Sequence, residues 1–216
     1  MKKEHRKLVV MVSSTVYGIE EMLDRIYTLL TSFGYEVWMS HKGTVPVSST
    51  QTAFENCLQA VEKCDLFLGI ITTSYGSGQD RQGGQLSITH QEILKAIELD
   101  KPRWLLAHEQ VVFARTLLNN LGFKGKRGRN KLSLKKKQVF DDLRIIDLYE
   151  AAVVDIEPPD AVPLGERKGN WVQKFRTHED GSLFVSAQFG RYQEVEAFIT
   201  ENFTRMDASP YGESDR

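Results

Sequence analysis

The sequence predicts a three-layer α/β fold in which helices flank a parallel β-sheet. Two apolar, β-branched runs, Leu8 to Val12 and Asp65 to Ile71, are typical of strands that are buried on both faces of such a sheet. Helical patterns alternate with strand patterns from residue 8 to residue 107. This alternation indicates parallel strands joined by right-handed crossovers.

Local signals place the elements of this first half. After the first strand, apolar residues recur at three- and four-residue steps from Ile19 to Leu30 and predict a helix that stops at Gly34. A helix is also expected from Thr50 to Lys63, because Thr52 and Glu55 form a capping-box pattern. The other expected elements are a strand at Tyr35 to Met39, a loop at Thr72 to Gly84, a helix at Thr89 to Leu99 and a strand at Arg103 to Ala107.

The second half carries weaker signals and predicts a helical C-terminal extension. Asp180 and Gly181 fit either a hairpin turn or the cap of a helix that begins near Ser182. The other expected elements are helices at Gln110 to Leu121, Leu134 to Val154 and Tyr192 to Phe203, and a strand at Trp171 to Phe175.

Length and composition indicate one domain over residues 1–206, followed by a flexible tail at 207–216. The chain has 216 residues, of which 41% are apolar, enough for one core. No apolar run approaches the roughly 20 residues that a membrane span needs. We therefore expect a cytoplasmic protein with no membrane contact.

The sequence predicts no metal site and no bound cofactor. Cys57 and Cys64 lack Cys-x-x-Cys spacing, and no two of the five histidines are three or four residues apart. We expect both cysteines to be reduced packing residues. No glycine-rich dinucleotide fingerprint and no phosphate-binding Walker sequence is present.

The segment from Lys124 to Lys137 makes the charge distribution lopsided. It contains eight basic residues and no acidic one, although the whole chain has a net charge of −1. We expect residues 122–137 to form a mobile surface loop that contributes little to stability. The alternatives are contact with an anionic partner, with nucleic acid, or with an acidic face of another copy in a homo-oligomer.

Ligands of open parallel sheets bind beyond the carboxyl ends of the strands, so the loops at that edge hold the candidate binding residues. Hydroxyls, glycines and aromatic rings suit ribose, phosphate and a base, respectively. Alternatively, the hydroxyls cap the following helix, and Trp38 belongs to the core. The candidates are Ser13, Ser14, Thr15 and Tyr17 after the first strand, Trp38 at the end of the second, and Tyr75 and Gly76 after the third.

Four segments of the chain resemble the family called domain of unknown function 4062: Val10 to Thr15, Cys64 to Ile71, Tyr75-Gly76 and Ser87 to Pro102. The resemblance covers roughly residues 7–107. That family is similar to TIR domains and nucleoside 2-deoxyribosyltransferases in the order of its strands and in one glutamate on the helix before a Lys-Pro strand. The resemblance implies a flavodoxin-like or TIR-like sheet and a nucleotide, NAD or a nucleoside as ligand.

By position, the glutamate of this resemblance is Glu92. In the similar enzymes the corresponding residue acts at the anomeric carbon of a ribosyl group, as nucleophile or as stabiliser of an oxocarbenium-like transition state. The same residue forms a capping-box pattern with Thr89, which would give it a purely structural role.

Two functions are therefore expected. The first is an enzyme that cleaves the N-glycosidic bond of NAD or a nucleotide, with Glu92 as the reacting carboxylate, in a defence or signalling pathway. The second is a non-catalytic module that binds a nucleotide signal or a partner protein. The fold alone does not decide between them.

Overall fold

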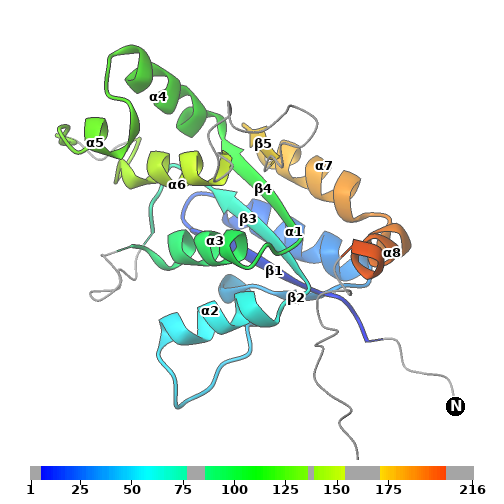
Figure 1. Ribbon diagram of the computed structural model, residues 1–216. Helices are drawn as coiled ribbons and strands as arrows, with labels where there is room; N and C mark the ends of the chain where they lie inside the picture. Colours follow the sequence, from blue (N-terminus) through cyan, green and yellow to red (C-terminus); the bar gives the residue numbers. More distant parts are fainter. Residues whose placement is uncertain (1–5, 77–85, 136–138, 154–170, 203–216) are drawn as a thin grey trace, which may run out of the picture.

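The computed structural model describes residues 6–76, 86–135, 139–153 and 171–202 (Figure 1). Five parallel strands form one sheet in the order β2-β1-β3-β4-β5, which is the order of flavodoxin-like three-layer folds. The strands are β1 (Val9–Ser14), β2 (Glu36–Trp38), β3 (Leu66–Ile71), β4 (Arg103–His108) and β5 (Val172–Phe175). The fold class expected from the sequence is confirmed.

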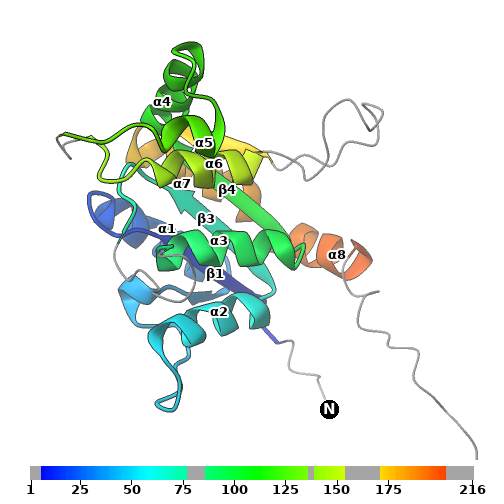
Figure 2. The same cartoon turned by 60° about the vertical axis from the view of Figure 1, so that its left-hand side comes forward.

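Helices cover both faces of the sheet (Figures 1 and 2). One face packs against α1 (Glu20–Ser32), α7 (His178–Phe189) and α8 (Tyr192–Asn202), and the other against α2 (Ala53–Lys63), α3 (Ile88–Glu98) and α6 (Arg144–Val153). The remaining helices are α4 (Glu109–Asn120), α5 (Gly125–Arg129) and the 3-10 turn η1 (Ser40–Lys42). Among the described residues, no helix has the length and apolar character to cross a membrane.

Alternation along the strands divides the core in two. Val10 and Val12 of β1 belong to the cluster on the α1 face, whereas Val9 and Met11 belong to the cluster on the α3 face. On the α3 face, a Cβ atom at Gly69 would lie 2.7 Å from Leu105 Cδ2. The glycine in β3 therefore lets the neighbouring side chains close over the sheet.

Helix α7, near the C-terminal end of the chain, completes the core on the α1 face. Val185 and Phe189 are fully buried there, and a Cβ atom at Gly181 would lie 2.5 Å from Met22 Sδ of α1. The hydroxyl of Tyr35 donates to the Phe189 carbonyl at 3.2 Å. The C-terminal extension is thus part of the main core.

The local signals were accurate where a side chain caps a helix. Thr52 and Glu55 form the expected capping box at the start of α2. Of the two alternatives at Asp180, the hairpin is wrong: Asp180 lies in the first turn of α7 and completes a capping box with Thr177.

Two expectations for the second half need correction. The helix predicted from Leu134 begins only at Arg144, because the Asp142 carboxylate accepts the Arg144 N–H at 2.8 Å and fixes a turn there. The basic segment contains a short helix, α5, and is not simply a solvated loop. Lys136, Lys137 and the tail at 207–216 lie outside the described residues.

Candidate functional site

The loops after β1 and β3 leave the same edge of the sheet and then diverge. The strands are adjacent, with Ser13 paired to Gly69 and Ser14 to Ile70, but β1 leads to α1 on one face and β3 leads to α3 on the other. The Oγ1 atoms of Thr15 and Thr72 lie 2.6 Å apart and join the two loops. This is the topological switch point at which open α/β sheets bind ligands.

Glu92 lies at this point with its carboxyl group enclosed. Glu92 projects from α3 and is 6% exposed, and the hydroxyl of Ser13 donates a hydrogen bond to its carboxyl group. The thiol of Cys57 on α2 donates a second hydrogen bond. No ion pair to Glu92 exists within the described part of the chain.

The surroundings of Glu92 favour its neutral form. Burial raises the pKa of this carboxyl above its usual range, although the hydrogen bonds from Ser13 and Cys57 act in the opposite direction. Burial also raises the pKa of Cys57 to about 12, so the thiol keeps its proton at neutral pH. The site therefore combines a protonatable carboxyl with two neutral donors.

The capping role expected for Glu92 is wrong. The N-cap of α3 is Ser87, whose hydroxyl accepts the His90 N–H at 3.3 Å. Thr89 consequently lies inside the helix, and Glu92, more than one turn from the cap, points toward β1 and α2.

A second hydrogen-bonded pair, Tyr75 and His90, flanks the same loop. The Tyr75 oxygen lies 2.9 Å from His90 Nδ1 and accepts the Ser87 N–H at 3.3 Å, which leaves its own proton for the histidine. Burial, with smaller contributions from Arg144 and Lys126, lowers the pKa of His90 to about 4. The imidazole is therefore neutral at physiological pH.

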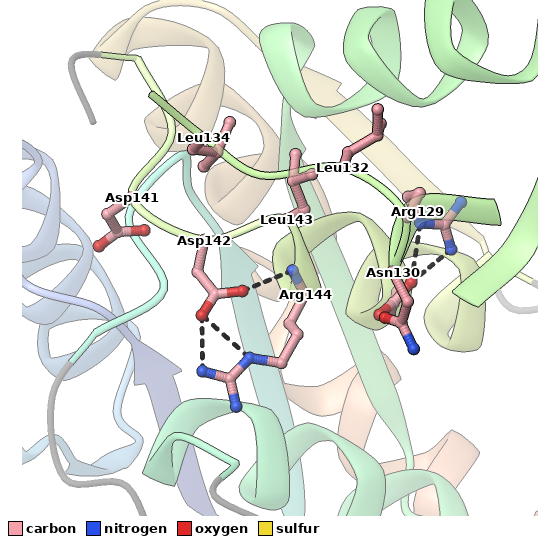
Figure 3. Close-up of a pocket in the computed structure, with 9 residues that line it drawn as sticks. Arg129, Asn130, Leu132, Leu134, Asp141, Asp142, Leu143 and Arg144 are labelled. Carbon is pink, nitrogen blue, oxygen red and sulfur yellow. Dashed lines mark hydrogen bonds and ion pairs between the residues drawn. The ribbon is translucent and has the colours of Figure 1, made fainter. Parts of the chain in front are cut away.

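Residues before and at the start of α6 form the outer wall beside Tyr75. Asp141 accepts the Tyr75 N–H at 2.7 Å, and the Arg144 guanidinium lies 4.5 Å from the centre of the Tyr75 ring. Next to them is a pocket of about 340 Å³, in which Asp142 and Arg144 pair opposite the apolar side chains of Leu132 and Leu134 (Figure 3).

Arg129 ties α5 to this wall. Only 3% of the residue is exposed, and its guanidinium donates to Asp147, at 2.8 Å from Nε, and to Glu150. Arg115 of α4 also pairs with Glu150. A buried, paired arginine is not the exposed, solvated side chain that was expected throughout the basic segment.

A protein-family model described as a domain of unknown function (DUF4062) matches residues 9–150. The chain belongs to this family. The DUF4062 match extends past residue 107, where the expected resemblance ended, and so includes Asp141 and Arg144. Among curated proteins, none matches the chain.

Of the residues expected at the site of this DUF4062 domain, five come together. Ser13 contacts Glu92, and Thr15 accompanies Tyr75 and Gly76 at the junction of the two loops. Gly76 has a φ of 87°, and a Cβ atom there would lie 2.4 Å from Thr15 Cγ2. Only glycine fits this position without movement of the loop.

The other expected residues lie apart from this cluster. Ser14 donates locally to the Thr15 carbonyl, and Tyr17 is 72% exposed. Trp38 is half-buried, packs against the core on the α3 face and donates to Glu36 at 2.8 Å, as its alternative interpretation held. The alternative for the hydroxyls is wrong, because the N-cap of α1 is Ile19 and no side chain caps that helix.

Sequence reasoning missed several members of the site. His90 is only two residues from Glu92 on α3, and both side chains are buried. Cys57 was expected to serve packing alone. Asp141 and Arg144 are more than sixty residues from Tyr75, and no local pattern links them. Among the described residues, no three His, Cys, Asp or Glu side chains are grouped to hold a metal ion.

Proposed function

We propose that this DUF4062 domain binds a nucleotide or nucleoside, NAD among the candidates, between the loops after β1 and β3 and cleaves its N-glycosidic bond. Glu92 is the reacting carboxyl group. The observation that carries the proposal is the enclosed Glu92 carboxyl, which has hydrogen-bond donors but no cationic partner among the described residues. Such burial costs free energy, and groups of this kind concentrate at functional sites.

The chemistry of the bond suits this carboxyl. Departure of the base takes the electron pair of the C–N bond and leaves positive charge on the anomeric carbon and ring oxygen of the sugar. The positive charge that develops on the sugar favours the ionised form of Glu92, which would stabilise or trap that charge. Water would then supply the hydroxyl to the sugar. The second proton of that water goes to the departing base of a neutral nucleoside, or to solvent when the neutral nicotinamide of NAD departs. Ser13 holds the carboxyl in place throughout.

The resemblance to TIR domains and nucleoside 2-deoxyribosyltransferases supports this proposal. By this resemblance Glu92 would correspond to the glutamate of those enzymes, and a role in defence or signalling rests on that resemblance alone. The flavodoxin-like strand order, with its switch point between β1 and β3, agrees with a ligand at this edge.

A second candidate is a module that binds a nucleotide signal without cleaving it. It is favoured by the low exposure of Glu92, whose two hydrogen-bond donors are both protein groups. In that case Glu92 would hold the loops together rather than react.

One experiment separates the two candidates. The protein is incubated with NAD and a panel of nucleosides and deoxynucleotides, released base is measured by chromatography, and binding is measured by calorimetry. Base release supports the enzyme, whereas binding without release supports the module. Neither binding nor release with any compound would contradict both.

A further inference from the structure

Helix α4 carries an exposed apolar stripe. Phe113, Leu117 and Leu121 follow one another at intervals of four residues and so lie on one side of the helix. They are 68%, 44% and 61% exposed. The opposite side of α4 holds the buried Val111 and the Arg115 pair with α6. We call these three residues the α4 stripe.

The position of α4 leaves this stripe accessible. The helix stands at one end of the molecule in both views (Figures 1 and 2), and its first turn packs against the core through Val111 while the three stripe residues stay exposed. Several large apolar residues on one side of one helix are unusual on a free surface and mark a contact site.

We propose that the α4 stripe is the two-fold interface of a homodimer, in which the α4 helices of two copies pack antiparallel. A two-fold axis at Leu117 places each Phe113 against Leu121 of the second copy. Each stripe is then covered along its whole length by an identical stripe, as an isologous contact requires.

The charges at the two ends of α4 favour the same arrangement. The helix begins at Glu109 and is followed by Lys124, Lys126 and Arg127, which are exposed and have no ion pair among the described residues. Antiparallel packing brings the acidic start of one helix to the basic end of the other, twice. The present partner of Glu109 is the exposed Arg176 at 3.3 Å, a surface pair that is easily exchanged.

The size of the stripe sets the strength of the dimer. A helix of 12 residues is about 18 Å long, so the contact falls at the small end of specific interfaces. We therefore expect a reversible dimer whose population rises with protein concentration. This inference is independent of the proposed enzymatic activity.

Disulfide cross-linking tests the register of the two helices. Leu117→Cys should form a covalent dimer on mild oxidation, because the axis brings residue 117 of both copies together. Phe113→Cys and Leu121→Cys should cross-link efficiently when mixed and poorly alone. Thr116→Cys is the exposed control on the same helix, and the unsubstituted chain reports on Cys57 and Cys64. Cross-linking of Thr116→Cys as efficient as that of Leu117→Cys would overturn the arrangement.

Sedimentation and charge exchange test the interface without cysteines. Leu117→Asp should weaken the dimer about tenfold or more, whereas Leu183→Asp, at an exposed leucine of α7, should not. Self-association should be weaker in Glu109→Lys alone and in the double variant Lys124→Glu with Lys126→Glu alone. Mixing the two variants should restore association, because each altered charge then meets an opposite charge. A chain that stays monomeric at high concentration, or a dimer unaffected by Leu117→Asp, would refute the proposal.

Discussion

The hydroxyl of Ser13, at the carboxyl end of β1, donates a hydrogen bond to the carboxyl group of Glu92 on α3, 79 residues away. This contact joins the first strand to the helix on one face of the sheet, at the edge where the loops after β1 and β3 diverge. Glu92 is therefore the residue whose substitution can distinguish a structural role, holding the strand and helix together, from a role in the reaction.

Replacing Glu92 with glutamine should separate folding from chemistry. The amide keeps the shape and removes the charge, so base release should fall about a hundredfold or more while the protein stays folded. Glu98→Gln, at an exposed glutamate of the same helix, is the matched control. A Glu92→Gln protein that retains base release within about threefold, or about 0.7 kcal/mol in barrier, would show that Glu92 does not react.

The same substitution should change how stability depends on pH. The folded protein holds the Glu92 proton more tightly than the unfolded chain does, because burial raises the pKa of this group. Stability from this source is complete below the ordinary value of 4.5 and is lost as pH rises through the folded pKa. Urea unfolding at several pH values should therefore show that the free energy of unfolding of Glu92→Gln rises relative to that of the unsubstituted chain as pH rises. The same pH dependence in both proteins would contradict this.

His90 should give the opposite dependence. Its pKa is about 4 in the folded protein and 6.5 in the unfolded chain, so the unfolded chain binds the proton first as pH falls. Acidification from 6.5 to 4 should cost about 3 kcal/mol, and His90→Gln should remove most of that loss. Thermal unfolding across this range measures it, and an equal loss in both proteins would exclude His90 as the cause.

The basic segment should divide into one structural residue and several dispensable ones. Arg129→Met removes the buried cation that Asp147 and Glu150 share, leaves Glu150 with Arg115 alone, and should lower the free energy of unfolding by about 3 kcal/mol or more. Arg127→Met, at an exposed position of the same helix, should change it by less than about 0.5 kcal/mol. Urea denaturation measures both variants, and similar effects would mean that the buried ion pairs do not anchor α5.

Gly76→Ala should strain the junction of the two loops. The backbone has a φ of 87°, and the added methyl group would meet Thr15 Cγ2, so we expect a loss of about 1–3 kcal/mol. Gly43→Ala, with a φ of 65° and open space around it, isolates the backbone contribution. Adding Thr15→Ser removes the Cγ2 atom and should recover part of the loss, and strict additivity of the two changes would rule out the clash.

The sequence predicted the fold well where burial and local capping dominate. The apolar runs of β1 and β3 and the Thr52 capping box have signals within a few residues. The start of α6 was predicted too early because the apolar spacing continues before Arg144, whereas the Asp142 side chain fixes a turn there and the helix begins only after it. The burial of Arg129 was not predicted, because it lies among many basic residues and its partners Asp147 and Glu150 are 18 and 21 residues away.

The candidate site was predicted residue by residue but not as a contact network. Ser13, Thr15, Tyr75 and Glu92 each followed from strand ends or from the family resemblance. That Ser13 touches Glu92 depends on how closely α3 lies over β1, which the packing around Gly69 controls. Asp141 and Arg144 reach Tyr75 only because α6 packs beside α3, and single-sequence patterns do not encode that distance.

The packing of α7 against α1 has a consequence for where this domain ends. The DUF4062 match stops at residue 150, yet Val185 and Phe189 complete the core on the α1 face. A chain cut after residue 150 would lose α7 and α8 from this face and would expose the side of α1 that packs against α7, including Met22, which lies against Gly181. The residues matched by the family model are therefore fewer than those that form the complete hydrophobic core. A fragment that ends at the family boundary should aggregate.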